Sequence, residues 1–124
     1  MNDNSNLVSD ELKLAIARFA EYLRADLDKF HGDSEYGKTS TDYWTADEPG
    51  KNVVRIIHAD RSGSHRSSYC FVVLRDGIIR GKQWKAGDIL MCAGWKAPAF
   101  NQARGNILTN EYRGCRWAGP GYLR

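Results

Sequence analysis

Residues 9–31 read SDELKLAIARFAEYLRADLDKFH, and this stretch decides the first half of the fold. Its large apolar residues recur at spacings of three and four, which is the period of an α-helix with one apolar face. Those residues are Leu12, Ile16, Phe19, Leu23, Leu27 and Phe30. Ser9 followed by Asp10 and Glu11 is typical of a helix start, because a serine hydroxyl accepts a bond from a backbone amide and acidic side chains favour that end of the helix dipole. We therefore predict an amphipathic helix that ends before Gly32 and whose stripe packs on the sheet or shares in a helix-to-helix subunit contact.

The chain beyond the helix is typical of a small antiparallel β-sheet. Residues 53–57 and 69–74 are rich in β-branched and aromatic side chains and are bounded by turn residues, as strands are. The polar loop between these two runs predicts a hairpin. Two further short strands are predicted at residues 78–79 and 89–91, after a tight turn at 76–77. The four strands together predict an antiparallel meander.

The helix and the strands are joined by residues 33–51, which are rich in Gly, Ser, Thr, Asp and Glu and predict a connector held down by its aromatic side chains. The predicted fold class is α+β, with a long N-terminal amphipathic helix packed with a small antiparallel β-sheet. We expect a single domain over residues 1–124, with the helix at about 9–31 and the β-rich part at about 52–124.

Length and composition indicate one globular unit. The 124 residues are 42% hydrophobic and 27% charged, which are ordinary values for one domain. Cys70, Cys92 and Cys115 form no even set and no close pair, which disfavours a secreted disulfide framework. The amino terminus is polar, and no run approaches the ~18 apolar residues of a membrane span. We therefore expect a cytoplasmic protein with no membrane partner.

The basic charge is concentrated in the second half of the chain. The formal net charge is +3, a mild excess that does not by itself mark a nucleic-acid-binding protein. The first 50 residues lean acidic, whereas most arginines and lysines follow residue 60. We expect an anionic ligand, if there is one, to bind to the second half.

Signatures of metal binding and catalysis are missing from the sequence. His31, His58, His65 and the cysteines are scattered singly, whereas structural zinc sites place two ligands two to four residues apart. There is no phosphate loop, no glycine-rich dinucleotide motif and no nucleophile elbow. We therefore predict no metal site, no cofactor and no catalytic residue, and a binding protein rather than an enzyme.

The loop at residues 61–68 contains two arginines, one of them Arg66, and four serines. Guanidinium forks match phosphate oxygens and hydroxyls add further donors, so this loop suits a phosphate. The alternative is a solvated loop that only connects two strands.

Residues 93–107 combine small residues and a proline with aromatic faces and amide edges, which suit a nucleobase. The residues that would contact the base are Trp95, Phe100, Asn101 and Asn106. The alternative is that the two rings fill the core and that Asn106 closes a turn.

Four segments of the second half form a recognisable pattern: GDIL at 87–90, GWKAPA at 94–99, ARGNI at 103–107 and WAGPGYL at 117–123. With this pattern the chain resembles a family of small phage proteins, the first described type of Thoeris anti-defence sponge. The resemblance covers about residues 53–124, and its most specific feature is the spacing between the second and third segments.

The resemblance implies a phage protein of the host-cell cytoplasm that sequesters cyclic ADP-ribose isomers, which are immune signals, without cleaving them. It implies sites shared between protomers of a homo-oligomer, a hexamer built from dimers. Cyclic di- or trinucleotides are implied as ligands of a separate arginine-lined site. A nucleic-acid partner is not implied.

Carried onto matching positions, the resemblance places Arg66, Met91 and Asn101 in the first pocket. Met91 stands where the family has an aromatic residue, and its thioether can still pack on a ring. For the second site the candidates are Arg24, Arg113 and Arg116. The full set of predicted ligand-binding residues is Arg24, Arg66, Met91, Trp95, Phe100, Asn101, Arg104, Asn106, Arg113 and Arg116.

The alternative function is a small phage nucleic-acid-binding protein, whose basic second half and exposed aromatic residues would grip a single strand. Loss of binding with salt and indifference to cyclic nucleotides would favour that alternative. A third hypothesis is an enzyme that degrades the signal, which would return product where a sponge returns intact ligand.

Overall fold

The computed structural model describes residues 8–31, 42–60, 66–93, 97–100, 102–112, 114–116 and 119. Within them the protein has one α-helix and antiparallel β-sheets, so the α+β class is confirmed. Two of the predicted site segments, at Trp95 and Asn101, lie outside the described residues, and so does Arg113.

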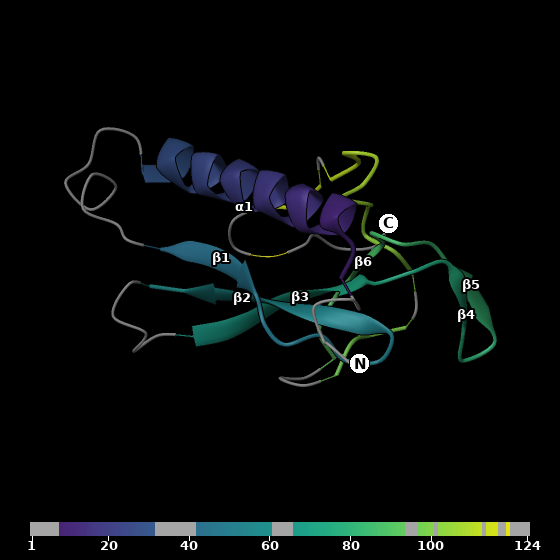
Figure 1. Ribbon diagram of the computed structural model, residues 1–124. Coiled ribbons are helices and arrows are strands. Elements are labelled where there is room, and N and C mark those ends of the chain that lie inside the picture. Colours follow the sequence, from purple (N-terminus) through teal and green to yellow (C-terminus); the bar gives the residue numbers. More distant parts are fainter. Residues whose placement is uncertain are drawn as a thin grey trace.

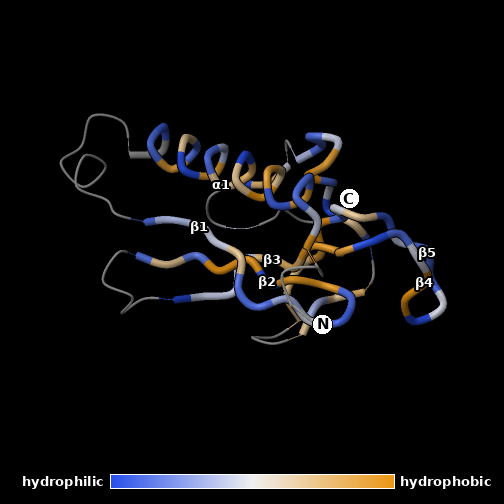
Figure 2. The backbone as a smooth tube through the Cα atoms, in the orientation of Figure 1, coloured by the Kyte–Doolittle hydropathy of each residue, from blue (hydrophilic) through white to orange (hydrophobic). Residues whose placement is uncertain are grey.

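The helix α1 runs over Asp10–His31, close to its predicted bounds. Ser9 caps it: the Leu12 amide donates to the serine Oγ at 3.1 Å, and the Lys13 amide donates to the serine carbonyl at 2.9 Å. The predicted apolar stripe is buried at Leu12, Phe19, Leu23 and Leu27. Figure 2 shows this apolar side of α1 turned toward the strands and the polar side turned away from them.

Four strands form the main sheet in the order β1-β2-β3-β6, with every neighbouring pair antiparallel. The strands are β1 (Tyr43–Ala46), β2 (Val53–Ala59), β3 (Arg66–Val73) and β6 (Ile89–Leu90). The predicted hairpin of two long strands is confirmed as β2 and β3, although both extend further toward their shared loop than the sequence indicated. α1 lies along the β1 side of this sheet (Figure 1).

Two strands were not predicted. β1 lies inside the stretch that we expected to be only a connector. Its four residues pair with β2, and it stands first in the order of the sheet, so it is an edge strand. β5 (Lys82–Trp84) pairs with β4 (Gly77–Ile79) in a separate two-stranded sheet, so the predicted continuous meander is wrong at this point. The tight turn of that hairpin lies at Arg80 and Gly81, whose φ angles are 53° and 78°, as a two-residue turn of the primed type requires.

The sheet has apolar residues on both faces. Val72 belongs to the buried cluster that includes the α1 stripe, whereas its neighbours Phe71 and Val73 belong to a second cluster with Trp84 and Leu90. Successive strand residues point to opposite faces, so the second cluster lies on the side of the sheet away from α1. We call this side the far face. It is covered in part by the β4–β5 hairpin and by the segment around Phe100.

Candidate functional site

Arg55 is a charged residue that the fold places on the far face. It stands in β2 between Val54 and Ile56, which both belong to the cluster under α1, so the Arg55 side chain projects to the opposite side. That side chain is only 16% exposed. A guanidinium this deep needs an anionic partner, because taking an unpaired charge out of water is costly.

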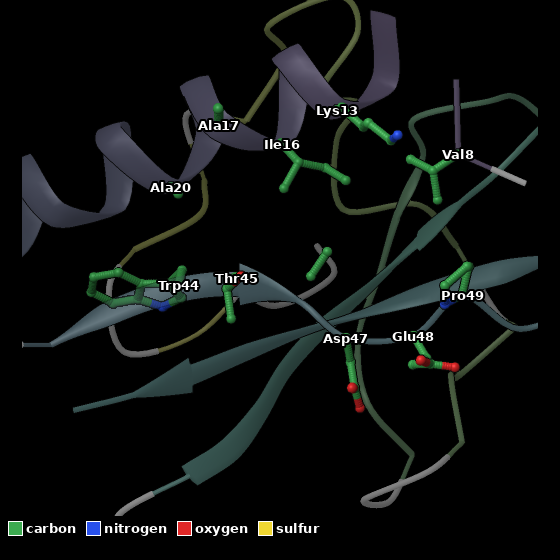
Figure 3. A pocket seen from close by; sticks show the side chains of 11 residues that line it. Val8, Lys13, Ile16, Ala17, Ala20, Trp44, Thr45, Asp47, Glu48 and Pro49 are labelled. Atoms are coloured by element: carbon green, nitrogen blue, oxygen red, sulfur yellow. The ribbon is translucent and has the colours of Figure 1, made fainter. Parts of the chain in front are cut away.

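The partner is Asp47, just after β1. The Nη2 of Arg55 donates to the Asp47 carboxylate, and the Asp47 amide donates to the Arg55 carbonyl at 2.9 Å. The pair is therefore fixed through both side chain and backbone. Figure 3 shows the Asp47 side chain pointing away from α1, as this pairing requires.

Arg66 adds a second positive charge near this pair. The pKa of Asp47 is lowered, chiefly by the hydrogen bond from Arg55 and by a backbone hydrogen bond from Glu48, with further contributions from the charges of Arg55 and Arg66. The register pairs Arg66 with Ala59, which lies four positions after Arg55 on β2. Residues an even number of positions apart on a strand point to the same side, and directly paired residues share a side, so Arg66 lies on the far face with Arg55. We call Asp47, Arg55 and Arg66 the arginine cluster. It carries two positive charges and one negative charge, and Arg66 is exposed.

The aromatic part of the far face lies beyond Cys92. Burial raises the pKa of the Cys92 thiol while the charge of Arg55 lowers it, so the arginine cluster reaches this residue electrostatically. Cys92 packs on the same cluster as Phe100, which meets Trp84 edge to face at 5.9 Å between ring centroids. The guanidinium of Arg80 lies 4.9 Å from the centre of the Phe100 ring. The far face thus has cations and a carboxylate at one end and two rings in edge-to-face contact at the other.

Arg66 and Phe100 are the two described residues of the predicted set that the fold brings to the far face. Met91 follows β6, is half-buried, and accepts a hydrogen bond from the Ala99 amide at 2.8 Å through its carbonyl. Arg104 lies elsewhere. Burial raises the pKa of Cys115 to about 12 while the charge of Arg104 lowers it, which places Arg104 within electrostatic reach of a thiol in the cluster under α1.

Asn106 closes a turn. Its Nδ2 donates to the Ala86 carbonyl at 2.9 Å and to Asp88 Oδ1 at 3.0 Å. Its Oδ1 accepts from the amides of Leu108 at 2.8 Å and Thr109 at 3.2 Å. The Asn106 side-chain amide therefore makes all of its hydrogen bonds within the chain. This agrees with the alternative interpretation that Asn106 closes a turn.

Gly105 explains why the Arg-Gly-Asn sequence stands before that turn. Its φ angle is 147°, and a Cβ at this position would overlap the backbone carbonyl of Glu111. The close approach is what allows the Asn106 amide to donate to the Glu111 carbonyl at 2.8 Å. In this structure, the Gly105–Asn106 part of the third segment of the sequence pattern therefore closes the 106–111 turn.

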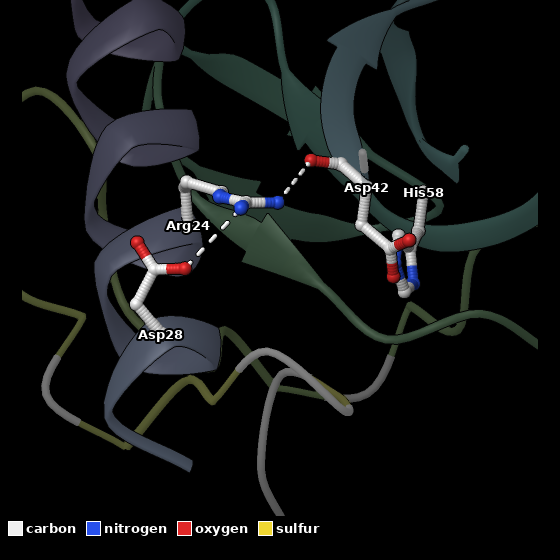
Figure 4. Close-up of polar contacts among 4 residues, drawn as sticks. All are labelled: Arg24, Asp28, Asp42 and His58. Atoms are coloured by element: carbon white, nitrogen blue, oxygen red, sulfur yellow. Dashed lines mark hydrogen bonds and ion pairs between the residues drawn. The ribbon is translucent and has the colours of Figure 1, made fainter. Parts of the chain in front are cut away.

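Of the three arginines considered for a second site, Arg113 lies outside the described residues, and the other two, Arg24 and Arg116, have carboxylate partners (Figure 4 shows Arg24). Arg24 bridges Asp28 at 3.3 Å and donates to the Asp42 carbonyl at 3.0 Å. Arg116 pairs with Asp26 at 3.2 Å. Positions 24 and 26 lie about 200° apart around a helix, so these contacts hold the two arginines on different sides of α1.

His58 and Asp42 form a further polar contact at the β1 edge. His58 Nε2 lies 2.9 Å from Asp42 Oδ2 (Figure 4). The imidazole also stacks on the Trp44 indole, with ring centroids 4.4 Å apart. Because Arg24 also binds Asp42, this contact ties α1, β1 and β2 together. Its place between three elements suits a structural role.

A cavity of about 820 Å³ lies between α1 and the β1–Pro49 segment (Figure 3). Ile16 and Ala20 line it from the helix, Trp44 and Pro49 line it from the strand side, and Lys13 and Glu48 supply charge. None of the predicted ligand-binding residues that the structure describes lines this cavity.

Within the described residues, no three His, Cys, Asp or Glu side chains gather as metal ligands would, and no helix is long and apolar enough to cross a bilayer. The sequence reasoning missed Arg55 and Asp47. The available signal in the sequence was a single arginine among the four apolar residues of the run VVRII at 53–57.

Comparison of the chain with protein-family models, with curated proteins and with solved structures finds no match.

Proposed function

We propose that the protein binds and sequesters cyclic nucleotide immune signals, cyclic ADP-ribose isomers above all and cyclic oligonucleotides in addition, and that it releases them uncleaved. This is the role of the phage Thoeris anti-defence sponges that the second half of the sequence resembles. The proposal adds a homo-oligomer built from dimers, in which neighbouring protomers complete each site, in the host-cell cytoplasm.

The observation that carries the proposal is the exposed Arg66 beside the Asp47–Arg55 pair. The carboxylate of Asp47 neutralises Arg55 and holds it in place, whereas Arg66 is exposed and lies close enough to affect the same carboxylate. A pyrophosphate oxygen that approaches Arg66 gains a charge-assisted hydrogen bond in a region of excess positive charge. This arrangement supports anion binding at the place where the resemblance puts the first pocket.

The aromatic end of the far face supports the other half of such a ligand. Phe100 is half-buried, its edge-to-face contact with Trp84 fixes its orientation, and the guanidinium of Arg80 lies over its ring, so a base that packs at this end would meet a fixed ring together with a cation. Arginines and rings of this kind bind a nucleotide by contact alone. The proposed activity therefore needs no nucleophile and no general base.

The proposal is tested by calorimetric titration of the purified protein with a cyclic ADP-ribose isomer. We expect saturable binding that Arg66→Ala weakens and that Arg18→Ala, an exposed arginine on α1, leaves unchanged. No heat of binding with any isomer or with a cyclic dinucleotide, from a folded protein, would contradict the proposed function.

A further inference from the structure

β1 has an outer edge whose hydrogen-bonding groups the sheet does not use. The Asp47 amide donates to the Arg55 carbonyl at 2.9 Å, so the backbone groups of residue 47 are directed toward β2. In an antiparallel ladder this direction alternates from one residue to the next. Thr45 therefore also faces β2, whereas Trp44 and Ala46 direct their N–H and C=O groups to the outer edge.

The neighbouring Asp42 shows how α1 satisfies one such outer group. Its carbonyl lies at the same edge, two positions before Trp44, and it accepts from Nη1 of Arg24 on α1 at 3.0 Å. Within the described part of the chain, no residue supplies a similar partner for the outer groups of Trp44 and Ala46. These N–H and C=O groups are therefore suited to pair with another extended backbone.

The cavity of about 820 Å³ between α1 and β1 runs along this edge. The consecutive residues 44–49 all line it. Neighbouring residues of a strand point to opposite faces of a sheet, so a space that all of them line lies beside the strand and not over one face. The α1 wall is formed by Ile16, Ala17 and Ala20 (Figure 3), and the two small alanines leave room beside the strand.

Trp44 adds a buried donor at one end of the cavity. This residue is 5% exposed, and its Nε1 donates to no acceptor among the described residues. A buried N–H without an acceptor costs free energy, because the hydrogen bond that it made to water in the unfolded chain is not replaced. The indole therefore favours an occupant that brings an acceptor, such as a backbone carbonyl or a hydroxyl.

Lys13 places a positive charge at the other end of the cavity. Its side chain projects from α1 at that end (Figure 3) and is exposed. It forms no ion pair with a carboxylate of the described residues. An acidic side chain of an occupant that points toward α1 would therefore meet an ammonium group without a competing partner. Glu48 also lines this end, but from the strand wall.

A second copy of the chain fits this edge poorly. Pairing β1 with the β1 of another copy would set the two strands about 4.8 Å apart. Each β1 has α1 alongside it, and the bond from Arg24 holds α1 at the edge of the strand. Packed helices need about 8 to 10 Å between their axes, so the two helices would overlap. The edge thus suits an extended segment that has no helix beside it.

We infer that the groove between α1 and the outer edge of β1 binds an extended peptide segment of a partner protein, which adds to the sheet as an antiparallel strand. Its backbone pairs with Trp44 and Ala46, as in other cases of strand addition to a sheet edge. The two peptide side chains opposite these residues point toward Ala17 and Ala20 and are apolar, and the side chain between them points to the opposite face.

The charge at the groove end fixes the rest of the recognised pattern. In the antiparallel direction, the peptide residue two positions before the first apolar one lies at the Lys13 end, on the α1 side, and is acidic. The pattern is therefore acid-x-apolar-x-apolar. This inference does not rest on the proposed function.

The first test is fluorescence anisotropy with two labelled peptides. GSETVTVSG carries the pattern, and GSVETTVSG has the same composition without it. We expect saturable binding of the first and about tenfold weaker binding of the second, because its two valines no longer share a face. Absence of binding by GSETVTVSG, or equal binding of the two peptides, would overturn the inference.

A backbone scan of the peptide tests the strand pairing itself. An N-methyl group on either valine replaces an N–H that faces β1 and should weaken binding about tenfold, because a hydrogen bond is lost and the methyl group meets the edge. The matched control is N-methylation of the threonine between the valines, whose N–H points away from β1 and which should bind as the parent peptide does. Equal losses at all three positions would show that the peptide is not held as a strand.

Ala46→Pro tests the same pairing from the protein side. Proline removes the outer N–H and is tolerated at a sheet edge, where that N–H has no partner in the sheet. Binding of GSETVTVSG should fall about tenfold. Full binding by the folded variant, or a smaller oligomer mass in light scattering in place of lost peptide binding, would overturn the assignment to a peptide.

A charge exchange tests the groove end. Lys13→Glu should weaken binding of GSETVTVSG about threefold and should strengthen binding of GSKTVTVSG, in which lysine replaces the acid, by about the same factor. Lys29→Glu makes the same change at the other, exposed end of α1 and should alter neither affinity. Equal effects of the two variants would show only a response to net charge and would overturn the assigned direction of the peptide. Cyclic ADP-ribose binding should be unchanged in all these variants, so the two proposals succeed or fail separately.

Discussion

Arg66 is an exposed charge that lies near an ion pair whose own charges cancel. Asp47 and Arg55 fix each other through two hydrogen bonds, and Arg66 stands close enough to act on the same carboxylate. A ligand phosphate at Arg66 would gain a charge-assisted bond worth about 1.5 to 3 kcal/mol. Arg66→Ala should therefore weaken cyclic ADP-ribose binding by one to two decades in calorimetry. Unchanged affinity in a folded variant would remove this loop end from the site.

Asp47 gives the protein an acid-sensitive contribution to stability. Its pKa is lowered in the folded state, so its contribution is present above the ordinary value of about 3.9 and is lost as the pH falls through the folded pKa. Asp47→Asn should lower the free energy of unfolding at pH 7 by about 1 kcal/mol, because the pair is partly open to water.

That difference should shrink below about pH 4, where the wild-type carboxylate takes up its proton. Urea unfolding from pH 7 to pH 2.5 measures both curves, and Glu48→Gln at the exposed neighbouring position serves as the control. A gap between wild type and Asp47→Asn that stays constant over this range would show that the Asp47–Arg55 ion pair does not stabilise the fold.

At the scale of elements, the 106–111 turn depends on one glycine. A Cβ at Gly105 would overlap the Glu111 carbonyl. Moving either atom away would break the two backbone hydrogen bonds between Asn106 and Glu111. Gly105→Ala should cost about 3 kcal/mol of stability. Gly114→Ala is the matched control, because nothing lies within 4 Å of its added Cβ. Equal melting temperatures for the two variants would contradict this role for the Arg-Gly-Asn segment.

Sequence periodicity was sufficient for α1 and for the β2–β3 hairpin, because both bury a regular apolar pattern. It was insufficient for β1 and β5. β1 is a four-residue edge strand with three of its residues exposed, so it carries no alternating apolar pattern. β5 begins with Lys82, which has low strand propensity and depends on the turn before it. The glycine at 77 looked like the turn, yet the positive φ angles lie at Arg80 and Gly81.

The candidate site was predictable in the same uneven way. Arg66 was found because it stands in a loop rich in phosphate-binding groups. Arg55 was missed because its importance comes from Asp47, which lies just after another strand, and strand register cannot be counted along one segment. Asn106 looked like a ligand-reading amide because its hydrogen bonds go to residues as far away as Ala86, which only the fold brings near.

At the scale of the whole molecule, two large apolar side chains remain exposed around α1 and β1. Leu14 is 64% exposed and Tyr43 is 43% exposed. They lie on different elements, and the assembly in which protomers share sites remains the proposal made from the resemblance. Light scattering after size exclusion should give a multiple of the 14.0 kDa chain mass, with a hexamer expected. A monomer mass at micromolar concentration would remove the shared-site arrangement.

Recovery of intact ligand is the most direct test of sequestration. The protein is incubated with a cyclic ADP-ribose isomer, freed of unbound ligand by desalting, and denatured by heat, and the released small molecules are quantified by mass spectrometry. Sequestration predicts that the cyclic ligand is retained through desalting and recovered unchanged after denaturation, and that Arg66→Ala retains much less. A linear hydrolysis product, or no retained ligand from wild-type protein, would contradict it.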